Sequence, residues 1–155
     1  MKKCKAVMIL CILFFAIIKP SVSAATKVTL YVYDEVEQKL KPIQVEGKSD
    51  ANTLIKLLKK HQMIPKKVRI NSFEITKENG IVYAHIDMTR EFKEYIETMG
   101  TFGEMICMYS LIHTIIVNQG VERVILTLEG EILETGHMIY DEYMEFDQKM
   151  VVDVH

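Results

Sequence analysis

The sequence predicts an α+β domain in which two helices pack on one face of a mainly antiparallel sheet. Three observations support this class. Two segments alternate polar and apolar residues, two others carry apolar residues at helical spacing, and an Asn-Gly pair joins two strand-like segments. The predicted elements follow the order β-α-β-β-α-β, and helices gathered on one face of a sheet satisfy the layer rule for small domains. The strand order inside the sheet stays open.

The first strand is predicted at residues 27–34, where KVTLYVYD alternates between apolar and more polar positions. Residues 35–48 are polar and contain Pro42. Because proline cannot donate to a sheet ladder, we expect a loop there, with only a short edge segment at residues 43–45.

The first helix is predicted to begin at Ser49 or Asp50, because the side-chain oxygen of either residue can accept from free backbone N–H groups. Pro65 is expected to stop the helix, since proline lacks the N–H that a helix interior needs. One apolar stripe at helical spacing would face the core: Leu54, Leu57 and Leu58.

Residues 67–76 and 80–88 are predicted to form a hairpin. The turn falls at Glu78–Gly80, where Asn-Gly accommodates a positive φ at low cost. Alternation breaks in the first of these strands, which predicts a β-bulge near Asn71. The expected core face of the second strand consists of Val82, Ala84, Ile86 and Met88.

A second helical region is interrupted by Gly100 and Gly103 and then becomes almost wholly apolar over residues 104–117. Such a helix is buried on most of its circumference, and Gly120 is expected to end it in a left-handed conformation. A last strand follows at residues 121–129. The buried helix also carries a narrow polar seam: Ser110, His113 and Thr114.

Composition divides the chain into three parts. Residues 1–24 have the pattern of a secretory signal: a basic start, an apolar run too short to span a bilayer, and small residues before a cut after Ala24. The alternative is that this segment stays uncleaved and anchors the protein in a membrane. Residues 25–140 are assigned to a single domain and residues 141–155 to an acidic tail.

Charge and cysteine content exclude several functions. All 21 acidic residues follow the predicted cut, whereas four of the 19 basic residues precede it, so the remaining chain carries 15 − 21 = −6. Such a chain lacks the positive charge of a general nucleic-acid binder. Cys4 and Cys11 would leave with the signal, so Cys107 has no partner for a disulfide or a zinc site, and we expect no metal and no cofactor.

Phosphate-binding, metalloprotease and CxxC motifs do not occur in the sequence. Cys107 and His113 would lie ~240° apart around one helix, out of mutual reach. We expect Cys107 to pack as a small apolar side chain and His113 to be a buried, hydrogen-bonded histidine. Thr101 and Glu104 have capping-box spacing, so Glu104 is expected to cap the helix rather than act as a catalytic acid.

Two charged clusters have more than one interpretation. The acids of the tail show no EF-hand spacing and are expected to form a solvated face: Asp141, Glu142, Glu145 and Asp147. A basic cluster without an intervening acid comprises Lys56, Lys59, Lys60, Lys66, Lys67 and Arg69. It is either a solvated face or a patch that docks an acidic surface, on another copy of the chain, an anionic wall polymer or a neighbouring envelope protein.

Three short motifs occur in an order that is typical of one family. GTFGE at Gly100–Glu104 is similar to a Gly-Ser-x-Gly-Glu turn before an apolar helix, and ETGH at Glu134–His137 is similar to an element that follows the last strand. Between them, residues 113–130 resemble the family's central stretch. Over residues 50–140 the chain therefore resembles the GerMN domain family. The residues expected to have structural roles in this pattern are Gly100, Thr101, Gly103, Glu104, Thr114, Gly130, Gly136 and His137.

The resemblance implies an exported, usually membrane-tethered α+β domain with no known catalytic role, similar to the ring-building modules that assemble between membranes during spore formation. We therefore expect a non-catalytic interaction module of the cell envelope, outside the cytoplasmic membrane, that acts in sporulation or germination. Its partners would be envelope or forespore-membrane proteins, or other copies of the chain. The alternative is a module that binds a wall glycan or peptide through Tyr140, Tyr143 and Phe146. An envelope hydrolase would need Glu104 and two histidines, His113 and His137, within reach of one another.

Overall fold

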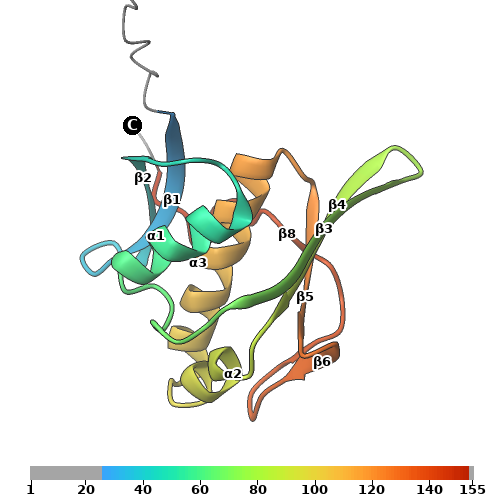
Figure 1. The fold of residues 1–155 in the computed structure, drawn as a ribbon. Helices are drawn as coiled ribbons and strands as arrows, with labels where there is room; N and C mark the ends of the chain where they lie inside the picture. Colours follow the sequence, from blue (N-terminus) through green and yellow to red (C-terminus); the bar gives the residue numbers. More distant parts are fainter. Residues whose placement is uncertain (1–25, 154–155) are drawn as a thin grey trace, which may run out of the picture.

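The fold is built around one helix, α3, which lies between a small sheet and a larger one (Figure 1). The computed structural model describes residues 26–153, so the predicted signal segment, residues 1–24, lies outside the described residues. In chain order the elements are β1 (Lys27–Asp34), β2 (Lys39–Glu46), α1 (Ala51–Lys60), β3 (Ile70–Glu78), β4 (Ile81–Met88), α2 (Glu91–Ile96), α3 (Thr101–Gln119), β5 (Arg123–Leu128), β6 (Glu131–Glu134), β7 (Ile139–Tyr140), β8 (Met144–Glu145) and the short 3₁₀ helix η1 (Gln148–Met150).

The α+β class is confirmed, but the strands form two sheets rather than one. Strands β1 and β2 pair with each other, and the larger sheet has the order β3-β4-β5-β6-β7, with β8 also paired to β5. All pairings are antiparallel except that of β4 with β5, which is parallel. Helices α2 and α3 connect these two strands, and a parallel pair needs such a long crossover.

Polar side chains of α3 explain why β1 and β2 stay apart from the larger sheet. Ser110 Oγ donates to the Tyr31 carbonyl at 2.5 Å, and Thr114 Oγ1 accepts from the Tyr31 N–H at 3.1 Å. One turn further on, the Asn118 amide accepts from the Thr29 N–H at 3.0 Å and donates to the Thr29 carbonyl at 2.7 Å. Four residues of a helix rise about 6 Å along its axis, and two residues of a strand about 6.6 Å. Side chains four residues apart on α3 can therefore bind backbone groups two residues apart on β1. The helix thus occupies the position of a neighbouring strand.

Two predicted boundaries are wrong. Residues 39–46 form a full strand, β2, in place of the expected loop, and Pro42 lies opposite Tyr31 in its register. The proline is tolerated because the N–H and carbonyl of Tyr31, the residue opposite it, bind α3 rather than β2, so the missing N–H of Pro42 removes no bond to β1. Helix α1 ends at Lys60, before the chain reaches Pro65.

Most local predictions about caps and turns are confirmed. Asp50 caps α1 by accepting from the Thr53 N–H at 3.0 Å. The hairpin turn has positive φ at both Asn79 and Gly80, 51° and 87°, and a register shift marks the expected β-bulge at the start of β3. Gly120 ends α3 in the left-handed conformation, with φ of 64°. These signals are local, so the sequence carries them directly.

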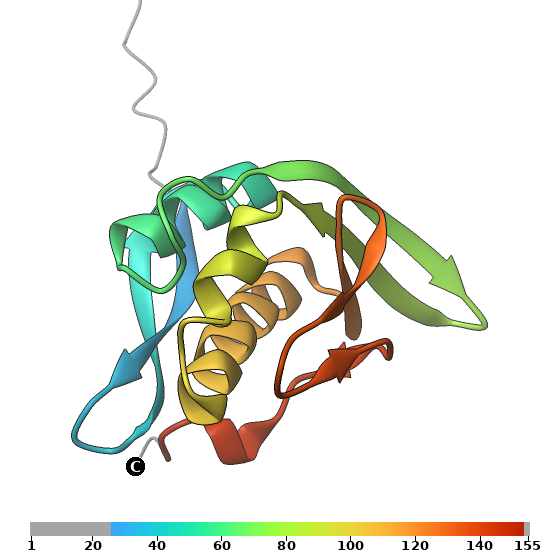
Figure 2. The ribbon, with the colours of Figure 1, turned by 90° about the horizontal axis from the view of Figure 1, so that it is seen from below.

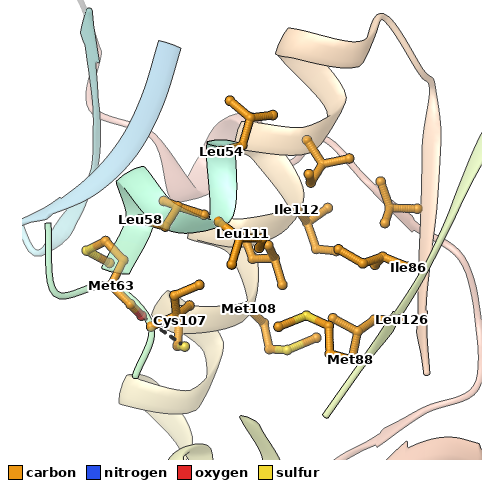
Figure 3. Packing of buried hydrophobic residues seen from close by; sticks show 14 of the residues in the cluster. Leu54, Leu58, Met63, Ile86, Met88, Cys107, Met108, Leu111, Ile112 and Leu126 are labelled. Atoms are coloured by element: carbon orange, nitrogen blue, oxygen red, sulfur yellow. Dashed lines mark hydrogen bonds between the residues drawn. The ribbon is translucent and has the colours of Figure 1, made fainter. Parts of the chain in front are cut away.

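The apolar core lies where α1 and α3 face strands β4 and β5. Figure 3 shows the side chains of these four elements meeting between the helices and the sheet. On the predicted core face of β4, three side chains are buried, whereas Val82 is only half-buried near the end of the hairpin. The core residues of these four elements that are labelled in this view are Leu54, Leu58, Cys107, Met108, Leu111, Ile112, Ile86, Met88 and Leu126.

The C-terminal residues, assigned above to a separate tail, close the fold. Strand β8 pairs with β5, and Val151 is buried at 4% exposure and bridges to Leu40 of β2. Strands β7 and β8 are only two residues long, so the periodicity of the sequence could not reveal them. Helix α1 and the C-terminal segment lie on opposite sides of α3 (Figures 1 and 2).

Candidate functional site

A groove with a volume of about 750 Å³ opens between the first half of α3 and residues 138–147. Four methionines contribute to its lining: Met105, Met108, Met138 and Met144. Four aromatic residues line it as well, among them the three that the sequence proposed for ligand binding: Tyr109, Tyr140, Tyr143 and Phe146. The structure therefore gathers the predicted aromatic residues around one hollow.

Glu104 holds one end of this C-terminal segment against α3. Its side chain is fully buried, and its Oε1 accepts from Thr135 Oγ1 at 2.7 Å and from the Tyr140 hydroxyl at 2.8 Å. Its Oε2 lies 2.9 Å from Nδ1 of His137. We call these four residues the Glu104 cluster. Two motifs noted in the sequence, GTFGE and ETGH, therefore meet in space, and His137 anchors the C-terminal part to α3.

Hydrogen bonding decides the charge of Glu104. Burial alone favours the neutral acid and would raise its pKa. The hydrogen bonds from Thr135, His137 and Tyr140 outweigh burial and hold the pKa of Glu104 below its ordinary value. The carboxylate is therefore ionised at neutral pH. Burial, and then the neighbouring carboxylate, raises the pKa of the Tyr140 hydroxyl, which stays protonated as a donor.

The predicted capping role of Glu104 is wrong. Gly100 occupies the N-cap position, and no side chain accepts a hydrogen bond at this helix end. Thr101 lines the groove instead of forming a capping box, and the Glu104 carboxylate faces the C-terminal segment. The spacing of Thr101 and Glu104 fits both roles, and only the distant donors decide between them.

His113 lies further along α3 and is also fully buried. Its Nε2 accepts from the Asp147 N–H at 3.0 Å, and its ring stacks on Phe146 with centroids 4.1 Å apart. The expectation of a buried, hydrogen-bonded histidine is confirmed. Burial lowers the pKa of His113 to about 4, so the ring is neutral. Within residues 26–153, Nδ1 finds no hydrogen-bond partner.

The groups that an envelope hydrolase would need do not come together. Glu104 and His137 are in contact, but His113 is nine residues along α3, about 13 Å along the helix axis. Cys107 does not bind His113 either: its Sγ donates to the Met63 carbonyl at 3.2 Å (Figure 3). Burial raises the pKa of this thiol to about 12, which removes it as a nucleophile at neutral pH.

The remaining residues of the sequence motifs lie outside the Glu104 cluster. A Cβ added at Gly103 would lie 3.1 Å from Cβ of Met99, so the first turn of α3 packs closely on the preceding chain. Gly130 has a φ of 83° in the turn between β5 and β6. Gly136 has open space around it, and Thr114 binds β1 rather than the groove.

The basic cluster forms a surface on α1 and the chain that follows it. Five of its side chains are exposed, whereas Lys59 is half-buried, and burial together with Arg69 lowers the pKa of Lys59. In the part of the chain that the structure describes, none of the six forms an ion pair. We call these residues the basic patch: Lys56, Lys59, Lys60, Lys66, Lys67 and Arg69.

The acids near the groove are not equivalent. Glu145 pairs with Arg123 at 2.7 Å, and Asp147 caps η1 by accepting from the Lys149 N–H. Asp141 and Glu142 are exposed, which agrees with the expected solvated face. Among residues 26–153, no three His, Cys, Asp or Glu side chains are grouped to hold a metal ion.

Hydropathy gives one further structural result. No helix between residues 26 and 153 combines the length and the apolar character needed to cross a bilayer.

A long helix between two sheets, with its buried carboxylate bound to a C-terminal Thr-Gly-His turn, makes this chain a compact α+β domain. The chain belongs to the Germane family, described as sporulation and spore germination, whose profile matches residues 21–134. The resemblance that the sequence motifs indicated is therefore confirmed.

The solved structures with a similar fold include proteins from two bacteria. A Clostridium perfringens protein assigned as a lipoprotein shares 18% identity and a TM-score of 0.51, over 78% of this chain and 87% of that chain. The first GerMN domain of the Bacillus subtilis sporulation protein GerM shares 17% identity and a TM-score of 0.54, over 80% and 98% of the two chains. The tandem GerMN domains of GerM give 17% identity and a TM-score of 0.58, over 77% of this chain and 46% of that chain. No curated protein sequence gives a significant match.

Sequence reasoning missed two parts of the site. Thr135 and Tyr140 complete the Glu104 cluster, although neither was expected to bind it. The methionines of the groove were also missed. The chain contains ten methionines, and most of them lie in the C-terminal half of the sequence. This enrichment was the available signal for a groove lined by methionine.

Proposed function

We propose that this chain is a non-catalytic protein-interaction module that acts outside the cytoplasmic membrane, in the assembly of envelope structures during sporulation or germination. Membership of the sporulation and spore germination family supports the process. The predicted signal at residues 1–24 and the similarity in fold to GerM and to a protein assigned as a lipoprotein support the location.

The basic patch carries the proposal. The six cationic side chains of the basic patch form no ion pair in the described part of the chain, although the full sequence carries a net charge of −2. Such a local surplus of positive charge favours an acidic partner surface and speeds its encounter. The expected partners are envelope or forespore-membrane proteins, or other copies of this chain.

The state of the reactive groups supports a role without catalysis. Three donors occupy Glu104, burial keeps the Cys107 thiol protonated, and His113 is enclosed and neutral. A catalytic acid or base needs access to substrate as well as a suitable pKa. In the described residues, these three groups lack that combination.

Crosslinking in sporulating cells tests the proposal. We expect the double variant Lys59→Glu/Lys60→Glu to capture much less of the partner proteins than the unchanged chain does. In pull-downs from extracts of the same cells, the loss should be greatest at low salt. The matched control, Lys48→Glu/Lys77→Glu, makes the same change in charge at exposed lysines outside the basic patch. Equal capture by both variants would remove the basic patch as the binding surface.

The location has its own test. N-terminal sequencing of the exported protein distinguishes a product that begins at Ala25 from one that keeps the apolar segment as an anchor. Recovery of the protein only from the cytoplasm would contradict the proposed location.

A second candidate function is binding of a wall glycan or a peptide. The groove favours this candidate, because Tyr140, Tyr143 and Phe146 all line it. Truncation at Glu134 cannot test this function, since residues beyond it close the fold. Substitutions of exposed residues at the groove rim are the suitable variants.

A further inference from the structure

We infer that the groove binds a cationic amphipathic peptide segment of a partner protein. This site lies on the side of α3 opposite α1 (Figures 1 and 2). It goes beyond the first proposed function, which depends on the basic patch, and it specifies the ligand class of the second candidate. The inference rests on the apolar lining of the groove, its exposed rim and its charge.

The rim of the groove exposes three large apolar side chains. Met138, Ile139 and Tyr143 are 49%, 59% and 39% exposed, and all three line the groove. A volume of about 750 Å³ is sufficient for several side chains of a ligand. Exposed large apolar groups gathered at one hollow mark an interaction site more often than single apolar residues on a surface do.

Methionine sets the kind of apolar ligand. Thioether side chains are flexible and polarisable, so a surface rich in methionine adapts to apolar side chains of different shapes. Helical peptides present such side chains at i, i+3 and i+4 and insert them into hydrophobic grooves. The lining of this groove therefore suits aliphatic or aromatic peptide side chains.

The negative charge of the groove favours a positively charged ligand. Four of the lining residues carry carboxylates, and no lining residue is Lys, Arg or His. Glu145 is already paired with Arg123, and Asp147 caps η1. Asp141 and Glu142 are exposed at the rim and enter no ion pair in the described part of the chain. Lys or Arg residues that flank the apolar anchors of a ligand would pair with these two carboxylates.

A glycan fits the lining less well. Sugar recognition would use free aromatic faces. However, the ring of Phe146 stacks on His113, and the ring of Tyr143 packs on that of Tyr83 with centroids 4.7 Å apart. The hydroxyl of Tyr140 is bound to Glu104. The free surface is therefore mainly thioether and aliphatic, which favours peptide side chains over sugar rings.

Titration of the full chain with two designed peptides tests the inference. Both peptides are amphipathic and helix-forming with the same Leu positions; one has Lys on its polar face, and the other has Glu. Selective ¹³C labelling of methionine methyl groups locates binding by NMR. We expect the Lys peptide to shift the signals of Met105, Met138 and Met144, and the Glu peptide to leave them unchanged.

Charge reversal separates groove binding from general attraction to an acidic protein. We expect Asp141→Lys/Glu142→Lys to weaken binding of the Lys peptide by at least about tenfold. The control Glu35→Lys/Glu46→Lys changes the net charge equally at exposed acids outside the groove, and is expected to change affinity less than about twofold.

Three results would overturn the inference. These are methyl shifts that avoid the groove, equal weakening by the two charge-reversal variants, and a response of the groove methyls to soluble wall glycan fragments but not to the Lys peptide. The variant Lys59→Glu/Lys60→Glu is expected to bind the Lys peptide as the unchanged chain does. Failure of the basic patch as a docking surface can therefore be distinguished from failure of the groove.

Discussion

Glu104 and His113 are both fully buried on α3, yet the protein accommodates them in opposite ways. Glu104 keeps its charge because three side-chain donors replace its hydration. Among the described residues, His113 has one hydrogen bond, from the Asp147 N–H, and the ring is neutral. The comparison shows that burial alone does not determine ionisation: the number of partners supplied to the charged form decides it.

The same two residues fix the C-terminal segment at two points. Glu104 binds residues 135–140, and His113 binds the backbone at Asp147. The chain between these points forms one wall of the groove. The first attachment is charged and cooperative, whereas the second is a single neutral bond, so we expect the first to contribute more to stability.

Removal of the Glu104 carboxylate is the strongest test of this comparison. Glu104→Ala leaves Thr135 and Tyr140 without their buried acceptor, so we expect the free energy of unfolding to fall by about 3–5 kcal/mol. Urea denaturation at neutral pH measures the change. The control Glu97→Ala removes an exposed carboxylate paired with Lys93 and is expected to cost about 0.5 kcal/mol or less. Similar losses for the two variants would show that the Glu104 cluster is not a major contributor.

Acidification tests His113 next. The unfolded histidine takes up a proton below its ordinary pKa of 6.5, whereas the folded one does so only below about 4. Stability is therefore complete above pH 6.5 and is lost as the pH falls toward 4, by roughly 3 kcal/mol in all. The lowered pKa of Glu104 acts in the same direction but at lower pH, since its stabilisation is present above its ordinary value of 4.5 and is lost below.

Denaturation curves recorded across this pH range measure the loss. In His113→Phe the decline between pH 6.5 and 4 is expected to become much shallower. A decline that is unchanged in this variant would assign the effect to other groups.

Tyr140→Phe should have a smaller effect, because it removes only one of the three donors to Glu104. We expect a loss of about 1–2 kcal/mol in the free energy of unfolding. The pKa of Glu104 should rise toward its ordinary value, which carboxyl ¹³C NMR can follow during a pH titration. Tyr143→Phe is the matched control, since that hydroxyl is near His85 and not Glu104. A pKa of Glu104 that does not move in Tyr140→Phe would contradict the description of the cluster.

The smallest effect is expected for His113→Phe at neutral pH. The new ring keeps the stacking position on Phe146 and removes the unpaired Nδ1, but the Asp147 N–H loses its acceptor. These changes oppose each other, so we expect a net change within about 1 kcal/mol in urea denaturation. A loss as large as that of Glu104→Ala would remove the difference between the two attachments.

The parts of this fold that could be predicted depend on neighbours in sequence. The Asp50 cap, the Asn79–Gly80 turn and the left-handed Gly120 each follow from one or two residues. Strand β2 was missed because Pro42 usually argues against a strand, and only its position opposite Tyr31, whose backbone binds α3, makes the residue acceptable.

The candidate site was less predictable, because distant residues complete it. Glu104 was identified as important from its motif, but its role depends on Thr135, His137 and Tyr140. Likewise, Ser110 and Thr114 were identified as a polar seam, but no periodicity indicates that the seam would bind the backbone edge of β1.

The donors to Glu104 follow it by 31 to 36 residues, so a growing polypeptide presents the carboxylate well before its partners. Until residue 140 has left the ribosome, α3 cannot settle in its final place without an uncompensated charge in the apolar interior. We expect this domain to fold only at the end of its own synthesis. In an exported protein, as proposed above, a delay of this kind would keep the newly made chain loose while a translocation channel threads it.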